Sequence, residues 1–473
     1  MTFIRFKKFG KQEYAYQIQT LWNKQTQKPY QKSKYLGVVI NKEKSIFERK
    51  NSFKSEKSIL DFGDSYITRD CLEKTGFVSL IETVFGDKSK SLLALISYKL
   101  CYGSAMMYAS KWLEGNFANL QYKDVNLSSQ RISELFKYLG EESLQRIFFK
   151  KYLLDFVQAK NGIIIDVTSL PNQIHIPLSV WGLRGEEIDK QIRLLLVVDK
   201  ETHYPLMFRI LPGNIVDVST LENTLEELKK YDVKINSICM DAGFFSENNI
   251  KEMYERNIPF LTRMPSTRVI YKQLIEEEMP KIESVKNAIR YGKRGLFIKQ
   301  REIDLFGRNA FAYVVLDPQR KGRETSKLLL ETFDEKEQHN EKEMDYSLMK
   351  KGVMILISSE NISRQEIVSL YYLRQTAENL FGFSKADLNL LPLRVHSEET
   401  LRGFLLIQFL SLIAFIQLRN KLNTEFTVEE ALLIMRNLKC KVYDKEILVG
   451  ELTKQQKQIA EKFNILMPKR AGI

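Results

Sequence analysis

The chain has 473 residues, enough to bury a large core and to build more than one domain. It carries 72 Lys or Arg residues against 59 Asp or Glu residues, a formal net charge of +13, and 44% of its residues are apolar. This composition excludes an intrinsically disordered chain and indicates a basic globular protein.

Residues 1–57 hold most of the excess positive charge. They contain 14 Lys or Arg residues and 4 Asp or Glu residues, a net charge of +10. Short alternating stretches, YAYQIQTLW and KYLGVVI, lie on either side of a polar segment with a proline, which predicts a small β-rich unit. Because charge of this density attracts nucleic acid first and an anionic membrane surface second, we expect this unit to bind DNA.

Residues 58–155 are predicted to be helical, since SLIETVFG, KSLLALISYKLCYG and SSQRISELFKYLG each space their apolar residues by three or four. Ser128 or Ser129 is suited to cap the last of these helices. Arg131 and Lys137 in the same helix are suited to contact phosphates or base edges of DNA. We therefore predict a helical DNA-binding region, with an ordinary solvated helix as the alternative.

Residues 156–265 are predicted to form the first part of a mixed α/β core. The β-branched strand NGIIIDVTS contains Asp166, and RLLLVVD and YPLMFRIL then predict an antiparallel hairpin. Asp217 is placed to cap a helix that runs to about residue 231. Another apolar strand, INSICMD, ends in Asp241, and a turn, a helix and the strand PFLTRM follow it.

The second half of the chain begins with a change of pattern. In residues 266–350 basic residues are interleaved with aromatic ones and FAYVVL is strand-like, which predicts a β-rich insertion, while ETFDEKEQHNEKEMD predicts a solvated loop. Residues 351–425 resume the core with the strand GVMILIS, after which Ser363 and Glu366 form a capping box that opens a long helix. The tail, residues 426–473, is predicted to be helical and polar.

The cysteines and the longest apolar run bear on the compartment in which the protein works. The four cysteines lie far apart and form no Cys-x-x-Cys pair, so we expect neither a zinc site nor disulfides, and a reducing cytoplasm fits best. The run FLLIQFLSLIAFI is interrupted by Gln408 and Ser411 and is too short to span a bilayer. We expect a buried core helix there and no membrane partner.

The long helix has an unusual polar face. Tyr371, Arg374, Glu378 and Lys385 project within an arc of about 60°, because each residue turns a helix by about 100°. This face borders an apolar stripe and therefore the core. Taken alone, the pattern is more typical of an exposed ladder in which one ion pair contributes about 0.2–0.5 kcal/mol.

Three acidic residues occupy positions that a mixed sheet can bring together. Asp166 and Asp241 end predicted strands, and Glu378 lies on the helix at the edge of the core. Each acid alone is more typical of a turn cap or a solvated side chain, but three converging carboxylates require a cation. Hard oxygen ligands favour Mg²⁺ or Mn²⁺, and two such ions about 4 Å apart activate a water or a 3′ hydroxyl. The pattern predicts phosphodiester chemistry.

The same residues carry a resemblance to a known family. The spacing Y-x2-R-x3-E-x6-K, met by Tyr371, Arg374, Glu378 and Lys385, resembles the signature of the DDE transposases of bacterial insertion sequences, in the group named for insertion sequence four. The stretches IIIDVTS, PLMFRILPGNIVDVSTL and ICMDAGFFSENNI match in the same order. The resemblance covers nearly the whole chain.

The resemblance implies a fold and a metal site. It implies an RNase H-like catalytic core with Asp166 on the first strand, Asp241 after the fourth, and Glu378 on the helix behind the fifth. These three residues would be the catalytic residues and would hold two Mg²⁺ or Mn²⁺ ions. It also implies that residues 266–350 are the β-rich insertion known in this group.

The resemblance further implies partners. Tyr371, Arg374 and Lys385 would hold the phosphates of the transposon ends, and two copies of the chain would form a homodimer in the synaptic complex. The double-stranded DNA partners would be the transposon ends and the target. The expected location is the bacterial cytoplasm, in association with the nucleoid.

One departure from the family leaves the excision route open. Some relatives stack a flipped base on a Trp of the insertion, but the three Trp residues of this chain lie outside it. Tyr291, Phe306 or Tyr313 could substitute as the stacking side chain.

The sequence therefore predicts a metal-dependent transposase. It would bind the terminal inverted repeats of its insertion sequence, cleave DNA strands to free 3′ hydroxyls and join these to target DNA. One alternative is an RNase H-like nuclease or resolvase that does not transfer strands. The other is a domesticated transposase that acts as a DNA-binding regulator through residues 1–155.

Overall fold

The computed structural model of the chain divides into two compact units. It describes residues 2–10, 12–23, 27–42, 45–48, 56–157, 162–184, 187–214, 220–334 and 341–472. The first unit comprises Met1–Leu60, Lys439–Glu451 and Pro468–Ile473, and the second comprises Asp61–Leu438 and Leu452–Met467.

The first unit contains two four-stranded sheets. The N-terminal sheet has the order β1 (Thr2–Phe9), β2 (Gln12–Asn23), β3 (Lys28–Asn41) and β4 (Ile46–Glu48), and each neighbouring pair is antiparallel. The other sheet has the order β18 (Arg470–Gly472), β17 (Glu446–Val449), β16 (Lys439–Val442) and β5 (Ser58–Asp61). The basic N-terminal segment is therefore β-rich, and its binding to DNA stays a prediction.

The prediction of a purely helical tail for residues 426–473 is wrong. Helices α16 (Val428–Arg436) and α17 (Lys454–Lys462) are present, but strands β16 and β17 lie between them and pair with each other. The reason is local, since β16 alternates exposed and buried residues with the period of a strand.

The helical region after β5 forms seven α-helices, whereas the first residues of the range predicted to be helical, 58–61, form strand β5 instead. The helices are α1 (Gly63–Lys74), α2 (Phe77–Phe85), α3 (Ser89–Cys101), α4 (Ala109–Gly115), α5 (Ala118–Gln121), α6 (Ser129–Leu139) and α7 (Glu142–Lys151). Ser128 stands in the extended N-cap position of α6, as expected, but its side chain makes no capping hydrogen bond.

A ten-stranded mixed sheet forms the rest of the core of the second unit, which confirms the predicted mixed α/β architecture. Its order is β12-β13-β14-β15-β11-β10-β6-β8-β7, and β9 also pairs with β8. Strands β6, β10 and β11 are parallel to one another, and β8 and β9 form the predicted antiparallel hairpin. The strands are β6 (Ile163–Pro171), β7 (Val180–Arg184), β8 (Glu187–Asp199), β9 (Pro205–Pro212), β10 (Ile238–Met240), β11 (Phe260–Arg263), β12 (Ala288–Tyr291), β13 (Arg294–Leu305), β14 (Arg308–Leu316) and β15 (Val353–Ser358).

Helices connect these strands. Between β9 and β11 lie α8 (Leu221–Lys230) and α9 (Glu247–Glu255). The proposed cap of α8, Asp217, lies outside the described residues. The buried residues of α8 recur at three- and four-residue intervals, which gives the helix one apolar side to pack.

The insertion at residues 266–350 is not predominantly β, which corrects the prediction. Besides β12, β13 and β14 it contains α10 (Val269–Glu278), α11 (Pro318–Asp334) and α12 (Glu341–Met349). The segment predicted as a solvated loop is helical at both ends, because runs such as KLLLE and EKEMD are rich in strong helix formers. The three strands continue the core sheet through β15.

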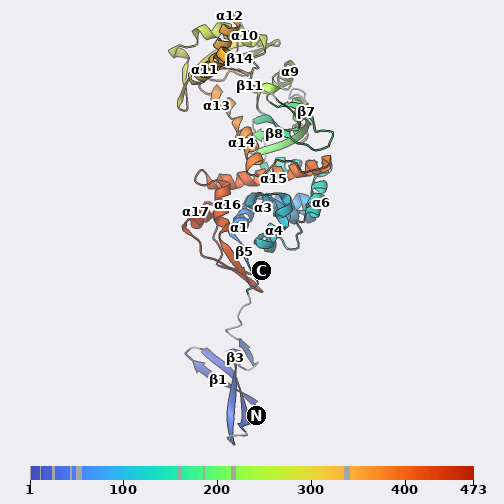
Figure 1. Cartoon of the computed structure of the whole chain (residues 1–473), viewed down its shortest axis with the longest axis vertical. Coiled ribbons are helices and arrows are strands. Elements are labelled where there is room, and N and C mark those ends of the chain that lie inside the picture. Colours follow the sequence, from blue (N-terminus) through green and yellow to red (C-terminus); the bar gives the residue numbers. More distant parts are fainter. Residues whose placement is uncertain are drawn as a thin grey trace. The chain divides into compact units, whose positions relative to one another are not determined.

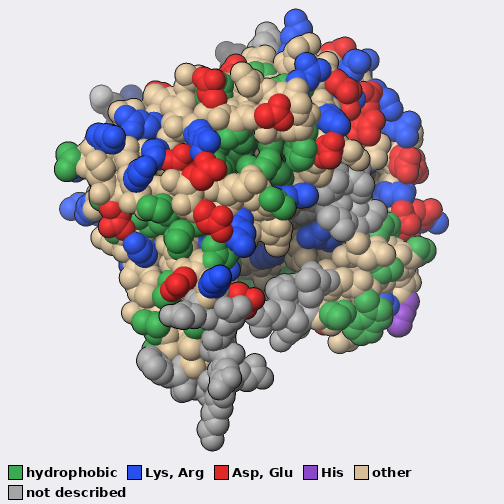
Figure 2. Space-filling view, turned by 90° about the horizontal axis from the view of Figure 1, so that it is seen from above, with side chains coloured by type: hydrophobic (Ala, Val, Ile, Leu, Met, Phe, Trp, Pro, Cys, Tyr) green, Lys and Arg blue, Asp and Glu red, His purple; other side chains and the backbone are tan. Residues whose placement is uncertain are grey.

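Many of the basic side chains of the insertion have acidic partners. Lys321 lies 2.6 Å from Glu283, and Arg294 lies 3.0 Å from Asp317. Seen from the end that carries α10–α12, Lys and Arg side chains are interspersed with Asp and Glu (Figure 2). The positive charge of the insertion is therefore largely balanced locally.

Helix α15 (Glu398–Leu422) connects the sheet with the helical region (Figure 1). It contacts α14 and β9 as well as α1, α3 and α6. Its length and composition would allow it to cross a membrane, but 94% of its most apolar stretch is buried inside the fold. The prediction of a buried core helix in this region is confirmed.

Two glycines permit the close crossing of α15 and α6. A methyl group on Gly403 would overlap the carbonyl oxygen of Phe136 in α6, and one on Gly140 would overlap that of Glu399. Both contacts are with backbone, which cannot move aside as a side chain can. The two helices approach this closely only because glycine stands at each crossing point.

This crossing gives a test of the packing. We expect Gly403→Ala to lower the free energy of unfolding by about 1–3 kcal/mol, because the added methyl forces the helices apart. Gly382→Ala is the matched control, since Gly382 is also helical but has open space at the Cβ position. The control should be neutral or gain up to about 1 kcal/mol. Urea unfolding of both variants measures the difference, and equal stability of the two would contradict the close crossing.

Candidate active site

Two acidic residues stand side by side where the parallel pairing of β6 with β10 ends. Strand β10 ends just before Asp241, but β6 continues to Pro171, so the prediction that a strand ends at Asp166 is wrong. In the pairing of β6 with β10, Ile165 lies opposite Met240. The next residues are Asp166 and Asp241, so their Cα atoms lie at the same level on strands about 4.8 Å apart. Asp166 is 7% exposed, whereas Asp241 is partly open to solvent.

The helix with the polar face is broken, which corrects the prediction of one continuous helix. The Ser363 hydroxyl donates to the Glu366 carboxylate at 2.7 Å, but α13 begins at the next residue and spans Ile367–Tyr372. A turn with three-residue hydrogen bonds follows, and α14 spans Gln375–Ala386. Arg374 is the N-cap residue of α14, so the arc calculated for one straight helix does not apply.

The break places Arg374 among three carboxylates. Its Nη2 atom lies 2.8 Å from Glu378 Oε1, its Nη1 atom lies 3.5 Å from Asp166 Oδ1, and its Nε atom lies 3.9 Å from Asp241 Oδ1. The Tyr371 hydroxyl donates to the same Asp241 oxygen at 3.2 Å. Five of the residues predicted for the site therefore form one cluster.

Lys385 contacts the strand that carries Asp166. Its Nζ atom donates to the hydroxyl of Thr168 at 2.7 Å, two residues beyond Asp166 on β6. Residues two apart on a strand face the same side of the sheet. Lys385 therefore lies on the same side of the sheet as the carboxylate cluster.

The cluster changes the acidity of its members. Burial raises the pKa of Asp166 to about 7, opposed by the charge of Arg374 and reinforced by Asp241 and Glu378. Burial also raises the pKa of Tyr371, so this hydroxyl stays protonated. Burial alone would lower the pKa of Arg374, but the surrounding acids outweigh it and raise that pKa. Arg374 is thus a permanent cation among groups that repel one another.

The donor set suits a divalent metal ion. Asp166, Asp241 and Glu378 offer carboxylate oxygens, the ligands that Mg²⁺ and Mn²⁺ prefer. Within the described residues no three acidic, His or Cys side chains are close enough to hold an ion as they stand. Arg374 lies among the three carboxylates, and its guanidinium supplies the positive charge that a metal ion would otherwise bring. The chemistry of the residues fits a metal, provided that Arg374 gives up these contacts.

The two predicted DNA contacts outside the cluster lie on α6. Arg131 and Lys137 are both exposed. The Arg131 Nη1 atom lies 2.7 Å from Glu134 Oε2 in an exposed ion pair. A DNA phosphate would therefore have to compete with Glu134 for Arg131.

The proposed stacking residues differ in their surroundings. Tyr313 is fully buried and its hydroxyl donates to the Ile362 carbonyl, so it cannot stack on a base. Tyr291 is half-buried and stacks on Tyr372 with 5.5 Å between ring centroids. Phe306 is also half-buried, and its ring lies near that of Phe245.

Sequence reasoning missed Arg263, which lies at the end of β11, the next parallel strand beside β10. In the pairing of β10 with β11, Thr262 lies opposite Met240, so Arg263 lies level with Asp241. Its charge reaches Tyr371, whose pKa it lowers. Its backbone pairs with β15, but its side chain makes no hydrogen bond or ion pair in the described part of the chain. The stretch PFLTRM predicts a strand, but only the pairing of β11 with β10 places Arg263 beside Asp241.

Comparison with known proteins identifies the family of the chain. The family model described as "Transposase DDE domain" matches residues 158–414, more than half of the chain. No curated protein matches the sequence. A solved structure of a piggyBac transposase synaptic complex with hairpin DNA is similar at 13% identity and a TM-score of 0.38, over 85% of this chain and 70% of that one. A TM-score this low does not establish a common fold.

Removing Arg374 tests its place among the carboxylates. We expect Arg374→Gln to destabilise the metal-free protein by about 1–3 kcal/mol, because three acids lose their counter-charge. Mg²⁺ should raise the unfolding temperature of this variant more than that of the unaltered protein. Arg131→Gln, which removes an exposed ion pair, should cost less than about 1 kcal/mol. Thermal unfolding with and without Mg²⁺ measures both, and a metal-free Arg374→Gln protein of unchanged stability would contradict the arrangement.

Proton competition gives a second test. The folded-state pKa of Asp166 is raised to about 7 from 3.8, so below about pH 7 the folded protein keeps a proton that a metal ion must displace. The rise in unfolding temperature caused by Mg²⁺ should therefore grow from about pH 6 to about pH 8. Asp166→Asn cannot titrate and should show a smaller rise with a flatter pH profile. A steep profile in this variant would assign the dependence to another group.

Proposed function

Because this chain belongs to the DDE transposase family, we propose that it binds the terminal inverted repeats of an insertion sequence, cleaves DNA to free 3′ hydroxyls and joins them to target DNA. The observation that carries this proposal is the convergence of Asp166, Asp241 and Glu378 on one guanidinium, where the parallel pairing of β6 with β10 ends. A cluster that already concentrates negative charge around a cation suits metal-dependent phosphoryl transfer.

The sheet supports an RNase H-like core in this proposal. The strands run in the order β9-β8-β6-β10-β11, with β6, β10 and β11 parallel and the hairpin β8–β9 antiparallel. Counted along the chain, these strands are β6, β8, β9, β10 and β11. Asp166 lies on the first of them, Asp241 follows the fourth, and Glu378 lies on a helix after the fifth. The insertion enters between β11 and the helix that carries Glu378. The order of these parts favours the insertion-sequence-four group.

DDE transposases use divalent metal ions, and here Asp166, Asp241 and Glu378 would hold two Mg²⁺ or Mn²⁺ ions. Bound there, the ions would activate a water or a 3′ hydroxyl and stabilise the leaving oxygen. The Tyr371 hydroxyl stays protonated and donates to Asp241, so it orients this carboxylate rather than acting as a nucleophile. The chemistry needs no covalent intermediate with the protein.

The cations of the site would bind DNA phosphates rather than metal ions. Once the carboxylates are neutralised, Arg374 can exchange them for a DNA phosphate, which its planar guanidinium binds through two hydrogen bonds. Lys385 supplies a second positive charge from its place beside Thr168. Arg263 adds a third from the end of β11. Together they would hold the transposon end against the carboxylates.

The remaining contacts with DNA would come from the N-terminal half. The basic strands β1–β3 and the exposed Arg131 and Lys137 of α6 would bind the terminal repeats through their charge. We propose that two copies of the chain bring two ends together in a synaptic homodimer. The protein would work in the bacterial cytoplasm, on the DNA of the nucleoid.

Substitution of the acids tests the function. Asp166→Asn, Asp241→Asn and Glu378→Gln should each lower Mg²⁺-dependent cleavage of the element's terminal DNA by about 100- to 1,000-fold or more, because each removes a charge from the cluster. All three should still bind that DNA in a gel-shift assay. Glu247→Gln is the control, because Glu247 is an exposed acid on α9 that should leave cleavage unchanged. Full cleavage by Asp166→Asn would refute the assignment.

The products distinguish the proposed reaction from its alternatives. Incubation with terminal DNA, a target plasmid and Mg²⁺ should give molecules in which the 3′ end is joined to the plasmid. Cleaved ends without joined molecules would indicate a nuclease or resolvase. DNA binding without any cleavage would indicate a regulator.

A further inference from the structure

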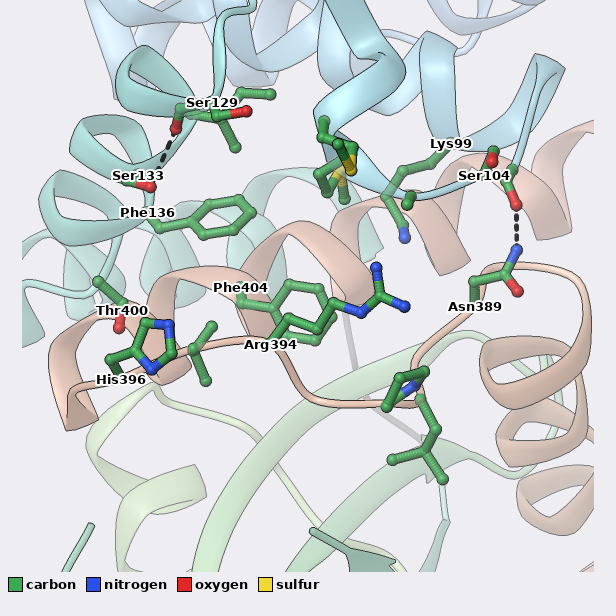
Figure 3. Close-up of a pocket in the computed structure, with 18 of the residues that line it drawn as sticks. Lys99, Ser104, Ser129, Ser133, Phe136, Asn389, Arg394, His396, Thr400 and Phe404 are labelled. Carbon is green, nitrogen blue, oxygen red and sulfur yellow. Dashed lines mark hydrogen bonds between the residues drawn. The ribbon is translucent and has the colours of Figure 1, made fainter. Parts of the chain in front are cut away.

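A cavity of about 600 Å³ shares none of its lining residues with the carboxylate cluster and has no role in the reaction proposed above. We call it the α3–α15 cavity. Its walls come from the end of α3, the loop after it, α6, the loop that follows α14, and the start of α15 (Figure 3). Its volume lies in the range of sites that bind small molecules.

Two cations of this cavity lack an acidic partner. Lys99 is 3% exposed, and its ammonium donates to the Leu388 carbonyl at 2.6 Å. Arg394 makes no hydrogen bond or ion pair in the described part of the chain. Figure 3 shows the charged ends of Lys99 and Arg394 pointing toward one another. No Asp or Glu is among the described residues that line the cavity, so two positive charges face a space without a negative one.

The electrostatic cost of this arrangement is visible in Lys99. Burial lowers the pKa of Lys99 to about 7, which shows that its surroundings do not compensate the charge. A buried cation that meets only a carbonyl is normally replaced by an apolar residue or paired with an acid. An anion that enters the cavity would provide the missing partner.

Flat apolar groups line the cavity beside these cations. The rings of Phe136 and Phe404 lie edge to face with 5.7 Å between their centroids, and both are buried. Lys99 Nζ lies 5.9 Å from the centroid of Phe404, so the positive charge and the aromatic wall adjoin. Met106 and Ile132 extend the apolar surface. A simple anion would make no contact with this apolar wall, and a neutral ring would leave the two cations without a negative partner.

We propose that the α3–α15 cavity binds a nucleoside monophosphate unit, with its phosphate against Lys99 and Arg394 and its base against Phe136 and Phe404. Phosphate matches the charge and hydrogen-bonding geometry of Lys and Arg, and a base matches an aromatic wall. The unit is either a free nucleotide or an unstacked nucleotide of bound DNA. The choice of a nucleotide among flat anions rests on the proposed function.

The cavity adjoins the loop after the helix that carries Glu378. The Leu388 carbonyl that accepts from Lys99 also accepts from Gln408 of α15 at 3.3 Å. Asn389 donates to the Gly103 carbonyl on the opposite wall. A ligand bound to Lys99 therefore lies against the segment that joins α14 to α15.

Binding of deoxyadenosine monophosphate to the full chain in the absence of DNA is the test. We expect it to raise the unfolding temperature and to give a calorimetric binding signal. Deoxyadenosine and inorganic phosphate should each bind at least about tenfold more weakly, because each uses half of the site. Equal binding by inorganic phosphate, equal binding by deoxyadenosine, or no binding of the nucleotide at millimolar concentration would each overturn the proposal.

Variants assign the binding to this cavity. Lys99→Met and Arg394→Gln should each weaken binding of the nucleotide by about 10- to 100-fold, because each removes a charge-assisted hydrogen bond. Arg394 is exposed, so its variant should fold even if Lys99→Met does not. Lys90→Met is the matched control, an exposed lysine of the same helix α3 that does not line the cavity. Nucleotide binding that survives in Arg394→Gln would place the site elsewhere.

Competition identifies the source of the nucleotide. If it belongs to bound DNA, a single-stranded oligodeoxyadenylate should displace the free nucleotide and lose affinity in Arg394→Gln. If it is a free metabolite, the oligonucleotide should leave nucleotide binding unchanged. Neither measurement depends on cleavage, so failure of nucleotide binding leaves the cleavage test of Asp166→Asn intact, and the reverse also holds.

Discussion

The arrangement of this protein depends on one charge balance, in which a single guanidinium faces three carboxylates. If Arg374 were absent, the carboxylates of Asp166, Asp241 and Glu378 would repel one another beside the central strands of the sheet. The contact links β6, the end of β10 and α14, which lie more than 200 residues apart at their extremes. This contact also explains how the site can be stable without a metal and still accept one, since a metal ion can replace the guanidinium of Arg374 as the positive charge among the carboxylates.

The second requirement is a rigid support for that site. Helix α15 runs between the sheet and the helical region and is buried along its length. It crosses α6 at two glycines, where backbone meets backbone. The loop between α14 and α15 is fixed by hydrogen bonds from Lys99 and Gln408 to the same carbonyl. The helix that carries Glu378 is therefore held at its far end by the helical region.

The sequence was most informative where local pattern and global position coincide. The β-branched run before Asp166 and the apolar run before Asp241 indicate strands. Neighbouring parallel strands bring residues at the same level together, so the proximity of these two acids could be predicted. The position of Arg374 could not, because it depends on a turn that interrupts the helix, and the flanking residues are all compatible with a continuous helix. The helices of the insertion were missed because its aromatic residues and short turns resemble those of strands. Arg263 was missed because a cation that ends a strand has no pattern of its own until the pairing with β10 is known.

The place of β15 in the sheet has a mechanical consequence. This strand is hydrogen-bonded to β11 of the core on one side and to β14 of the insertion on the other. An insertion joined by a flexible linker could rotate as a rigid body relative to the core. This insertion instead shares a continuous ladder of backbone hydrogen bonds with the strands next to the carboxylates. Any swing would have to break a row of backbone hydrogen bonds, so adjustment to a substrate is confined to twisting of the sheet as a whole. The insertion is thus held in one position relative to the core sheet, and the dimensions of the space beside the site are set when the chain folds.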